Sequence, residues 1–236
     1  MLVLLLASCA KDDNQELATI KDGPTTASID GMEGFFNSVK EVRHVSPPMG
    51  PIRIDNGTNV WFYKFPMPYS NAFIDVGDVF CNGLKLQKSG IPWTRVYVAD
   101  SGLVFNQNLT WTVTGGSGVQ PFTHVSTMGF PYVSELICPD TIVSGQPCTV
   151  SVDTLTNADS VEFWFGNAKF HAPGNVMSHT FSTAEVDSVV LNVPPGAVYT
   201  VRIPIYTYRH SGFIINGRKY YFRNVTFRTR DVSMRR

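Results

Sequence analysis

Histidine and carboxylate side chains are the residues of this sequence best suited to metal binding or acid–base chemistry. The five histidines are scattered along the 236 residues, and none stands at ligand spacing with another histidine, cysteine or carboxylate on one predicted element. The carboxylates of Asp100, Glu185 and Asp187 are candidates for a hydrolase pair, but their separation in space does not follow from the sequence. No Gly-x-Ser-x-Gly, His-Glu-x-x-His or phosphate-binding glycine motif occurs. We therefore expect no metal, no cofactor and no enzyme, with a hydrolase whose site is assembled from distant loops as the weaker alternative.

Cys9 follows a short apolar run, Met-Leu-Val-Leu-Leu-Leu-Ala-Ser. This run is far shorter than the roughly 20 residues that cross a bilayer as a helix. The segment Leu6-Ala7-Ser8-Cys9 resembles the bacterial lipobox, in which small residues permit cleavage before a diacylated cysteine. The resemblance implies that residues 1–8 are a signal-peptide remnant and that lipidation of Cys9 anchors the chain in a membrane. The other interpretation is a short buried strand with a core cysteine.

The residues behind Cys9 predict a tether. Residues 9–28 are polar and contain Gly23-Pro24, a composition that cannot bury a core. Lys11-Asp12-Asp13 is similar to the export signal of surface lipoproteins in the Bacteroidetes phylum, although a polar start to any tether would look the same. This similarity implies an outer-membrane lipoprotein that faces the cell exterior.

With Cys9 lipidated, three cysteines remain. Cys138 and Cys148 flank a segment in which Ser144-Gly145 predicts a turn, so the two thiols are candidates for a disulfide across a hairpin. Such a loop would stabilise the fold by roughly 2–3 kcal/mol on the chain-entropy model. The alternative is that these cysteines and Cys81 are small buried apolar residues.

Four tripeptides in the second half of the chain have the pattern Asp, Ser or Thr, then an apolar residue. They are similar to the O-glycosylation acceptor of exported Bacteroidetes proteins, which would make the modified residues Thr141, Thr154, Ser160 and Ser188. The other interpretation is turn chemistry, because Asp, Ser and Thr favour the turns that precede apolar strands.

Aromatic residues in predicted loops are the candidates for ligand binding. Trp93 follows Pro92 at the start of a strand, and Tyr69 lies between strands, so both could stack on a sugar or contact a protein. Half-buried packing is the alternative for each. Lys plus Arg and Asp plus Glu both number 19, so no net field attracts nucleic acid. Basic residues of the last 35, among them Arg202, Arg209, Arg218, Lys219, Arg223, Arg228 and Arg230, form a solvated sheet surface or meet an acidic glycan or another protein.

Short β runs separated by turns dominate from Asn59 onward and predict an all-β fold. Asn82-Gly83 and Asn216-Gly217 each lie between apolar runs and predict hairpins, because both turn residues tolerate positive φ. Residues 29–45 are ambiguous, since their apolar residues recur at helical spacing while Gly31 and Gly34 weaken a helix.

Cys148, Trp164 and Tyr199-x-Val201 carry a resemblance to immunoglobulin-like domains, with valine in place of the second cysteine. Leu109-Thr-Trp-Thr-Val-Thr-Gly-Gly also resembles repeats in Bacteroidetes lipoproteins of this build. The resemblance implies two immunoglobulin-like β-sandwich domains in tandem after the lipidated tether, at residues 29–133, with an irregular lead-in, and 134–236. We expect a cell-envelope lipoprotein with a non-enzymatic role in recognition, adhesion or assembly. The alternative is a glycan-binding accessory lipoprotein of a polysaccharide uptake system.

Overall fold

The protein is all-β, as predicted. The computed structural model describes residues 31–44, 52–63, 73–88, 93–95, 108–189 and 194–236. Within those ranges the one α-helix is the short α1 (Thr183–Ser188), and nearly all other regular structure is strand. No helix in the described ranges combines the length and apolar character needed to cross a membrane.

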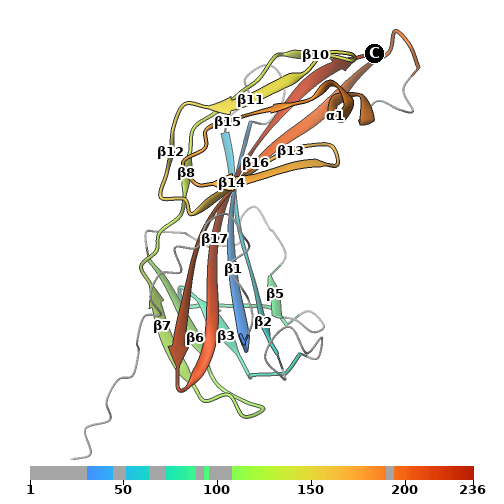
Figure 1. Cartoon of the computed structure of the whole chain (residues 1–236). Helices are drawn as coiled ribbons and strands as arrows, with labels where there is room; N and C mark the ends of the chain where they lie inside the picture. Colours follow the sequence, from blue (N-terminus) through green and yellow to red (C-terminus); the bar gives the residue numbers. More distant parts are fainter. Residues whose placement is uncertain (1–30, 45–51, 64–72, 89–92, 96–107, 190–193) are drawn as a thin grey trace, which may run out of the picture.

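One large sheet forms the backbone of the molecule. Figure 1 shows its two longest strands running from one end of the molecule to the other. In spatial order the sheet contains β14 (Ala168–Pro173), β13 (Ser160–Phe165), β16 (Val198–Ile215), β17 (Arg218–Arg235), β1 (Gly34–His44), β2 (Ile52–Phe62) and β5 (Trp93–Arg95), with β10 (Thr141–Val143) paired to β17. The pairing of β1 with β17 is parallel, and β16 pairs with β17 along its whole length.

Three smaller sheets complete the described structure. The first contains β15 (Ser178–Phe181), β11 (Cys148–Val152) and β9 (Leu136–Ile137). The second pairs β12 (Leu155–Thr156) with β8 (Tyr132–Val133). The third contains β4 (Leu84–Lys85), β3 (Val79–Cys81), β6 (Leu109–Val113) and β7 (Phe122–Ser126).

Both hairpins predicted from Asn-Gly pairs are confirmed. Asn82 and Gly83 join β3 to β4 with φ of 48° and 76°. Asn216 and Gly217 join β16 to β17 with φ of 52° and 76°. Positive φ at both central residues matches the right-handed twist of the flanking strands. The C-terminal strands are longer than the sequence indicated, because the separate runs from Val198 onward form a single hairpin.

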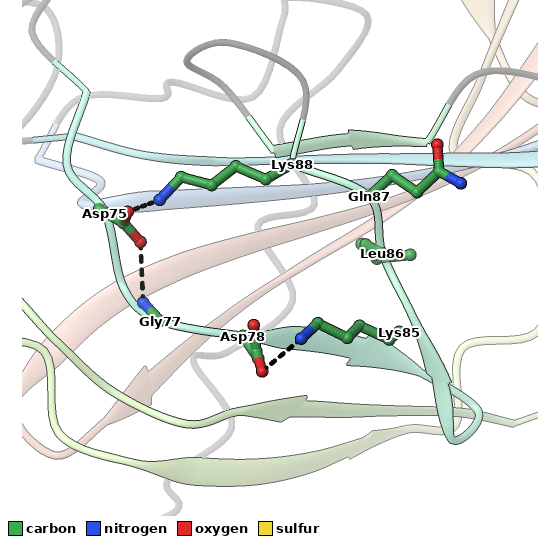
Figure 2. A pocket seen from close by; sticks show the side chains of 7 residues that line it. All are labelled: Asp75, Gly77, Asp78, Lys85, Leu86, Gln87 and Lys88. Atoms are coloured by element: carbon green, nitrogen blue, oxygen red, sulfur yellow. Dashed lines mark hydrogen bonds and ion pairs between the residues drawn. The ribbon is translucent and has the colours of Figure 1, made fainter.

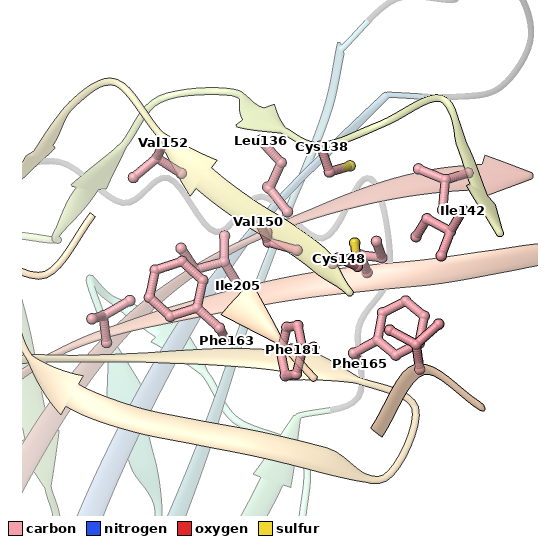
Figure 3. Packing of buried hydrophobic residues seen from close by; sticks show 14 of the residues in the cluster. Leu136, Cys138, Ile142, Cys148, Val150, Val152, Phe163, Phe165, Phe181 and Ile205 are labelled. Atoms are coloured by element: carbon pink, nitrogen blue, oxygen red, sulfur yellow. The ribbon is translucent and has the colours of Figure 1, made fainter. Parts of the chain in front are cut away.

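Two hydrophobic cores lie against the large sheet. Core 1 lies under the β15-β11-β9 sheet, and Figure 3 shows its packing around Phe163, Phe165 and Val150. Core 2 lies under the β4-β3-β6-β7 sheet and is rich in aromatic rings. Its large buried side chains are Phe36, Phe62, Trp111, Tyr220 and Phe222. Each end of the molecule is therefore a sandwich of the large sheet and a smaller one.

Both cores occupy the same face of the large sheet, which we call the core face. Along β16, Ile205 belongs to core 1 and Ile215 to core 2. Along β17, Phe222 belongs to core 2 and Met234 to core 1. Each pair is separated by an even number of residues, and side chains an even number apart on a strand share a face. The alternate residues of these strands, such as Tyr206 of β16 and Tyr221 of β17, point to the opposite face, which we call the outer face.

The ambiguous segment 29–45 contains a strand, not a helix. β1 lies between β17 and β2 in the large sheet, so both of its faces carry side chains in contact with neighbours. Phe36 enters core 2 while Phe35 contacts rings of the outer face, which produces adjacent apolar residues that mimic helical spacing. Gly34 serves a packing purpose here, because a Cβ at this position would lie 2.6 Å from the ring of Tyr220.

Candidate functional site

The side chains of Cys9, Tyr69 and Trp93, proposed for lipidation and for ligand stacking, are not described. Cys9 and Tyr69 lie outside the described residues. Trp93 is the first residue of β5, where its backbone pairs with Val60 at the end of the large sheet, and its side chain also lies outside the description. Lipidation of Cys9 and ligand stacking by Trp93 and Tyr69 therefore stay predictions.

The candidate O-glycosylation residues differ in exposure. Thr154 is exposed in the turn between β11 and β12, and Ser188 is exposed at the end of α1. Thr141 begins β10 and is half-buried. Ser160 begins β13 but is only 4% exposed, so its hydroxyl has no room for a sugar in the folded chain. Modification of the other three residues stays a prediction.

Cys138 and Cys148 are free, buried thiols in this structure. Both belong to core 1 and come from neighbouring parts of the chain, as Figure 3 shows. Burial, with a smaller contribution from nearby Cys138, raises the pKa of Cys148 to about 11, so the thiol stays protonated and unreactive near neutral pH. Their disulfide stays a prediction, and the remaining thiol, Cys81, is buried in core 2.

The carboxylates considered for chemistry have structural roles where they are described. Glu185 forms a capping box with Ser182 at the start of α1. Asp187 accepts hydrogen bonds from Ser144 Oγ at 2.6 Å and from the Gly145 amide at 2.8 Å. Asp100 lies outside the described residues. Among the residues that the structure describes, no group of three or more histidine, cysteine, aspartate or glutamate side chains could hold a metal ion.

A shallow surface pocket lies beside β3 and β4. Figure 2 shows Asp75 directed toward Lys88 and Asp78 toward Lys85 across this pocket. Asp78 Oδ2 lies 2.6 Å from Lys85 Nζ, and Asp75 forms an ion pair with Lys88. The charged side chains that line the pocket therefore form two ion pairs with each other at the surface.

The most distinctive cluster is a continuous row of seven aromatic rings on the outer face, which we call the aromatic ladder. Neighbouring ring centroids lie 4.9 to 6.5 Å apart. In spatial order the ladder contains Trp164, Tyr206, Tyr208, His210, Tyr221, Phe35 and Trp61. From Tyr206 to Phe35 each ring is inclined to the next by 26° or less. Phe227 stacks beside Tyr206 at 5.1 Å.

Strand register positions the ladder. Alternate residues of β16 point to one face, so Tyr206, Tyr208 and His210 form a row while Ile205 enters core 1. On the parallel pair, Phe35 is opposite Tyr221. On the antiparallel pair, Phe35 is opposite Trp61. The ladder therefore brings together residues up to 186 positions apart in the chain, from four strands in addition to β16.

Two cations lie on the rings of the ladder. Lys169 Nζ lies 3.9 Å from the centroid of the Trp164 ring. The guanidinium carbon of Arg223 lies 4.9 Å from the Phe35 centroid and 5.6 Å from that of Tyr208. Both distances are within the range of cation–π attraction. One cation thus lies at the Trp164 end of the ladder and the other lies beside its middle, between Tyr208 and Phe35.

Glu162 is the carboxylate that accepts hydrogen bonds from ladder side chains, while Glu41 lies within electrostatic range of Tyr206 and Asp159 within range of His210 and Tyr221. Glu162 Oε2 accepts hydrogen bonds from Trp164 Nε1 at 2.9 Å and Tyr208 Oη at 2.8 Å, and its Oε1 lies 3.1 Å from His171 Nδ1. Burial raises the pKa of this carboxyl, but the three hydrogen bonds outweigh burial, so the pKa is lowered overall. Burial, followed by the charge of Glu162, raises the pKa of Tyr208. The Glu162 carboxyl is therefore ionised at neutral pH, where the Tyr208 phenol stays protonated and donates to it.

The sequence analysis did not identify the ladder. Its strongest signal in the sequence was the alternation Tyr206-x-Tyr208-x-His210, which indicates three polar-aromatic side chains on one strand face. Trp164 was instead assigned to the buried framework of an immunoglobulin-like domain. In the structure Phe163 and Phe165 enter core 1, whereas Trp164 packs on Tyr206 on the outer face.

The aromatic ladder is suited to binding a ligand. Its described residues supply a row of rings, the cations Lys169 and Arg223 in contact with them, and the hydrogen-bonded carboxylate of Glu162, with Glu41 and Asp159 within electrostatic range. Comparison of the chain with protein-family models, with curated proteins and with solved structures finds no match.

Proposed function

We propose that this protein is a lipid-anchored component of a bacterial cell envelope with a non-enzymatic role in recognition, adhesion or assembly, and that the aromatic ladder is its contact surface. The observation that carries the proposal is the ladder itself. Seven rings outside both cores form one contiguous surface, and all but the buried Tyr221 are half-buried. Contiguous aromatic surface of this kind is typical of binding sites.

The lipid anchor and the cellular location belong to the same proposal. The lipobox-like Leu6-Ala7-Ser8-Cys9 supports lipidation of Cys9, and Lys11-Asp12-Asp13 supports export to the outer leaflet of an outer membrane of the Bacteroidetes type. We also propose that the two sandwiches are immunoglobulin-like domains. The buried Cys148 of β11 supports this assignment, whereas the outward position of Trp164 departs from the pattern of that family.

A glycan-binding accessory role in a polysaccharide uptake system is the second candidate function. The rings of the ladder favour it, because aromatic faces pack against the apolar CH faces of sugars while hydroxyl groups seek nearby polar atoms. The half-buried side chains of Tyr206 and Tyr208 provide both the ring surface and phenolic oxygens at the same place.

A binding experiment tests the role of the ladder. The purified protein, with Cys9→Ser to remove the lipid, is applied to an array of plant, host and microbial polysaccharides and to immobilised outer-membrane proteins of the native cell. We expect binding that Tyr206→Ala weakens at least tenfold. Tyr132→Ala is the matched control, because Tyr132 is 53% exposed on β8 and is not a ladder ring. The proposal is contradicted if the protein binds nothing on either array, or if Tyr206→Ala binds as tightly as the wild type.

Localisation has its own test. Intact cells are treated with protease and the protein is detected with an antibody against residues 134–236. Digestion in intact cells is expected for a surface lipoprotein. Survival in intact cells, with digestion only after lysis, contradicts the outward-facing address.

A further inference from the structure

We propose that the aromatic ladder selects a linear polysaccharide that carries carboxylate groups, and that Lys169 and Arg223 hold two of those carboxylates. This inference rests on the proposed recognition role of the ladder and names the chemical class of its ligand.

The first argument is the state of the two cations. Four other arginines of the described chain form ion pairs with carboxylates: Arg202 with Asp231, Arg209 with Asp159, Arg218 with Glu33 and Arg230 with Asp140. Within the described residues, Lys169 and Arg223 have no such partner; they contact rings, and Arg223 Nε also donates a 2.8 Å hydrogen bond to Asn37 Oδ1. A cation placed on rings without a carboxylate keeps its capacity to bind an anion.

The second argument is the spacing of these cations. Lys169 is opposite Trp164 on β13, and the neighbouring Phe163 is opposite Ile205 of β16. Arg223 is opposite His210, five residues further along β16. At about 3.3 Å per residue, this places the backbone positions of the two residues roughly 17–20 Å apart along the strand direction, with the Arg223 guanidinium leaning back toward Tyr208. A ligand that reaches both must be extended, with rings able to stack on the ladder between its charged groups.

The third argument is the position of Glu162. Its carboxylate lies between the cations, opposite Tyr206 in the register of β13 and β16, and would repel a ligand carboxylate at that point. Its accepting oxygens already face Trp164, Tyr208 and His171. The ladder therefore favours a chain whose charges are spaced apart, with neutral sugars or hydroxyl groups over Glu162.

The shape of the ladder favours a polysaccharide over a folded protein. Stable protein interfaces cover about 800 Å² on each partner and are broad patches with an apolar centre. The ladder is a single file of rings with Phe227 beside it. A single file suits a linear chain, which makes its contacts one sugar at a time.

Isothermal titration with defined polysaccharides tests the inference. The probes are hyaluronan, alginate and polygalacturonate, each paired with its carboxyl-reduced, uncharged form. We expect at least one charged polymer to bind, and its uncharged form to bind with at least tenfold lower affinity. Because exposed charges are screened by salt, the affinity should also fall as NaCl rises from 50 to 500 mM. Among the charged polymers, the alternating hyaluronan is expected to bind best.

Variants separate this inference from the proposed function. The double variant Lys169→Gln, Arg223→Gln should bind the charged polymer at least tenfold more weakly than the wild type and bind the uncharged form with unchanged affinity. The matched control, Lys85→Gln with Arg235→Gln, removes the same charge from positions outside the ladder and should stay within twofold of the wild type. Circular dichroism and thermal melting establish that both double variants fold.

Three outcomes overturn the inference. One is binding of none of the charged polymers, and another is equal binding of charged and reduced forms. The third is a Lys169→Gln, Arg223→Gln variant that binds the charged polymer like the wild type. If Tyr206→Ala still abolishes binding of a neutral glycan or an envelope protein in these cases, the recognition role survives and only its acidic ligand is wrong. If Tyr206→Ala also has no effect, both proposals fail.

Discussion

Glu162 illustrates how one residue organises the rings of the outer face. Three donors from three strands converge on one carboxylate: Trp164 on β13, His171 on β14 and Tyr208 on β16. A hydrogen bond to a charged acceptor is roughly twice as strong as a neutral one. The carboxylate therefore fixes the orientation of two ladder rings, and a surface of fixed rings loses less entropy when a ligand binds.

His124 makes the stability of core 2 depend on pH. Its ring packs 4.2 Å from the Phe213 centroid and 4.5 Å from that of Phe222, and its Nε2 has no hydrogen-bond partner within the described structure. Burial lowers the pKa of His124 from 6.5 to about 4. Between these values the unfolded chain binds the proton more readily than the folded chain, so the stability is present above pH 6.5 and is lost as the pH falls toward 4.

We expect His124→Phe to remove this part of the pH dependence. The difference in free energy of unfolding between pH 7 and pH 4 should shrink by about 1–2 kcal/mol, after allowance for the partial exposure of the ring. Urea unfolding at the two pH values measures it. Thr123→Phe, at an exposed neighbour on β7, should keep the wild-type difference. An unchanged difference in His124→Phe would show that the buried imidazole is not responsible.

At the residue scale, the sequence indicated which residues are buried better than it indicated the sheet face to which each side chain points. Cys148 was expected to be buried, and it is 1% exposed. The resemblance to immunoglobulin-like domains implies a buried Trp164, but Trp164 lies on the outer face. Glu162 lies two residues before Trp164 on the same strand, so the alternation itself places Trp164 with a polar side chain on the outer face. What one sequence does not show is the register with β16, about 40 residues away, which brings Tyr206 beside Trp164.

At the scale of elements, local chemistry was predictable and long-range pairing was not. Asn82-Gly83 and Asn216-Gly217 form the expected turns because the backbone of these two residues alone determines the turn type. The strand β1 was not expected, because its stability comes from parallel pairing with β17, more than 180 residues away. The ladder depends on that same pairing, since Phe35 meets Tyr221 only when β1 is in place.

A short linker, residues 127–131 between β7 and β8, connects the strands that cover core 2 to those that cover core 1. Buried polar side chains on the core face of β17 hold it. Asn224 Nδ2 donates to the Gly129 carbonyl and Thr226 Oγ1 donates to the Pro131 carbonyl, each at 2.7 Å. Asn224 is 2% exposed and Thr226 is 4% exposed, so water cannot replace these bonds without a change in packing.

We expect Thr226→Val to destabilise the protein by about 1–3 kcal/mol, because it keeps the shape of the side chain but leaves a buried carbonyl without its donor. Urea unfolding measures the loss, and hydrogen exchange should report faster opening of residues 127–131. The control is Thr229→Val, on the same strand but on the outer face, which should change stability by less than 0.5 kcal/mol on the scale of ordinary substitutions. Equal stability of Thr226→Val and Thr229→Val would mean that the linker is not held by this bond.

At the scale of the whole molecule, the β16–β17 hairpin belongs to both cores. The sequence predicted domains at 29–133 and 134–236, and whether these fold independently stays a prediction. The structure nevertheless places Ile215, Tyr220 and Phe222, all beyond residue 134, in core 2 with Phe36 and Trp111. The same two strands contribute to core 1 at their other ends, as Figure 1 shows for their course through the molecule.

This sharing leads us to expect one cooperative unfolding transition. A fragment of residues 134–236 would expose Tyr220 and Phe222, which are 1% exposed in the intact chain, and each buried aromatic side chain of this kind contributes about 1.5–3 kcal/mol when removed from water. Calorimetry should give equal calorimetric and van't Hoff enthalpies for the full chain, and the fragment should melt at a lower temperature or lack a transition.

A substitution at the centre of core 2 tests the same expectation. Trp111→Ala should lower the melting temperature of core 1 by the same amount as that of core 2, read from the near-ultraviolet dichroism of the remaining aromatic residues. Two separate transitions, with core 1 unaffected by Trp111→Ala, would establish independent domains. Because the ladder spans strands from both ends of the chain, a single transition would also mean that binding and folding are lost together.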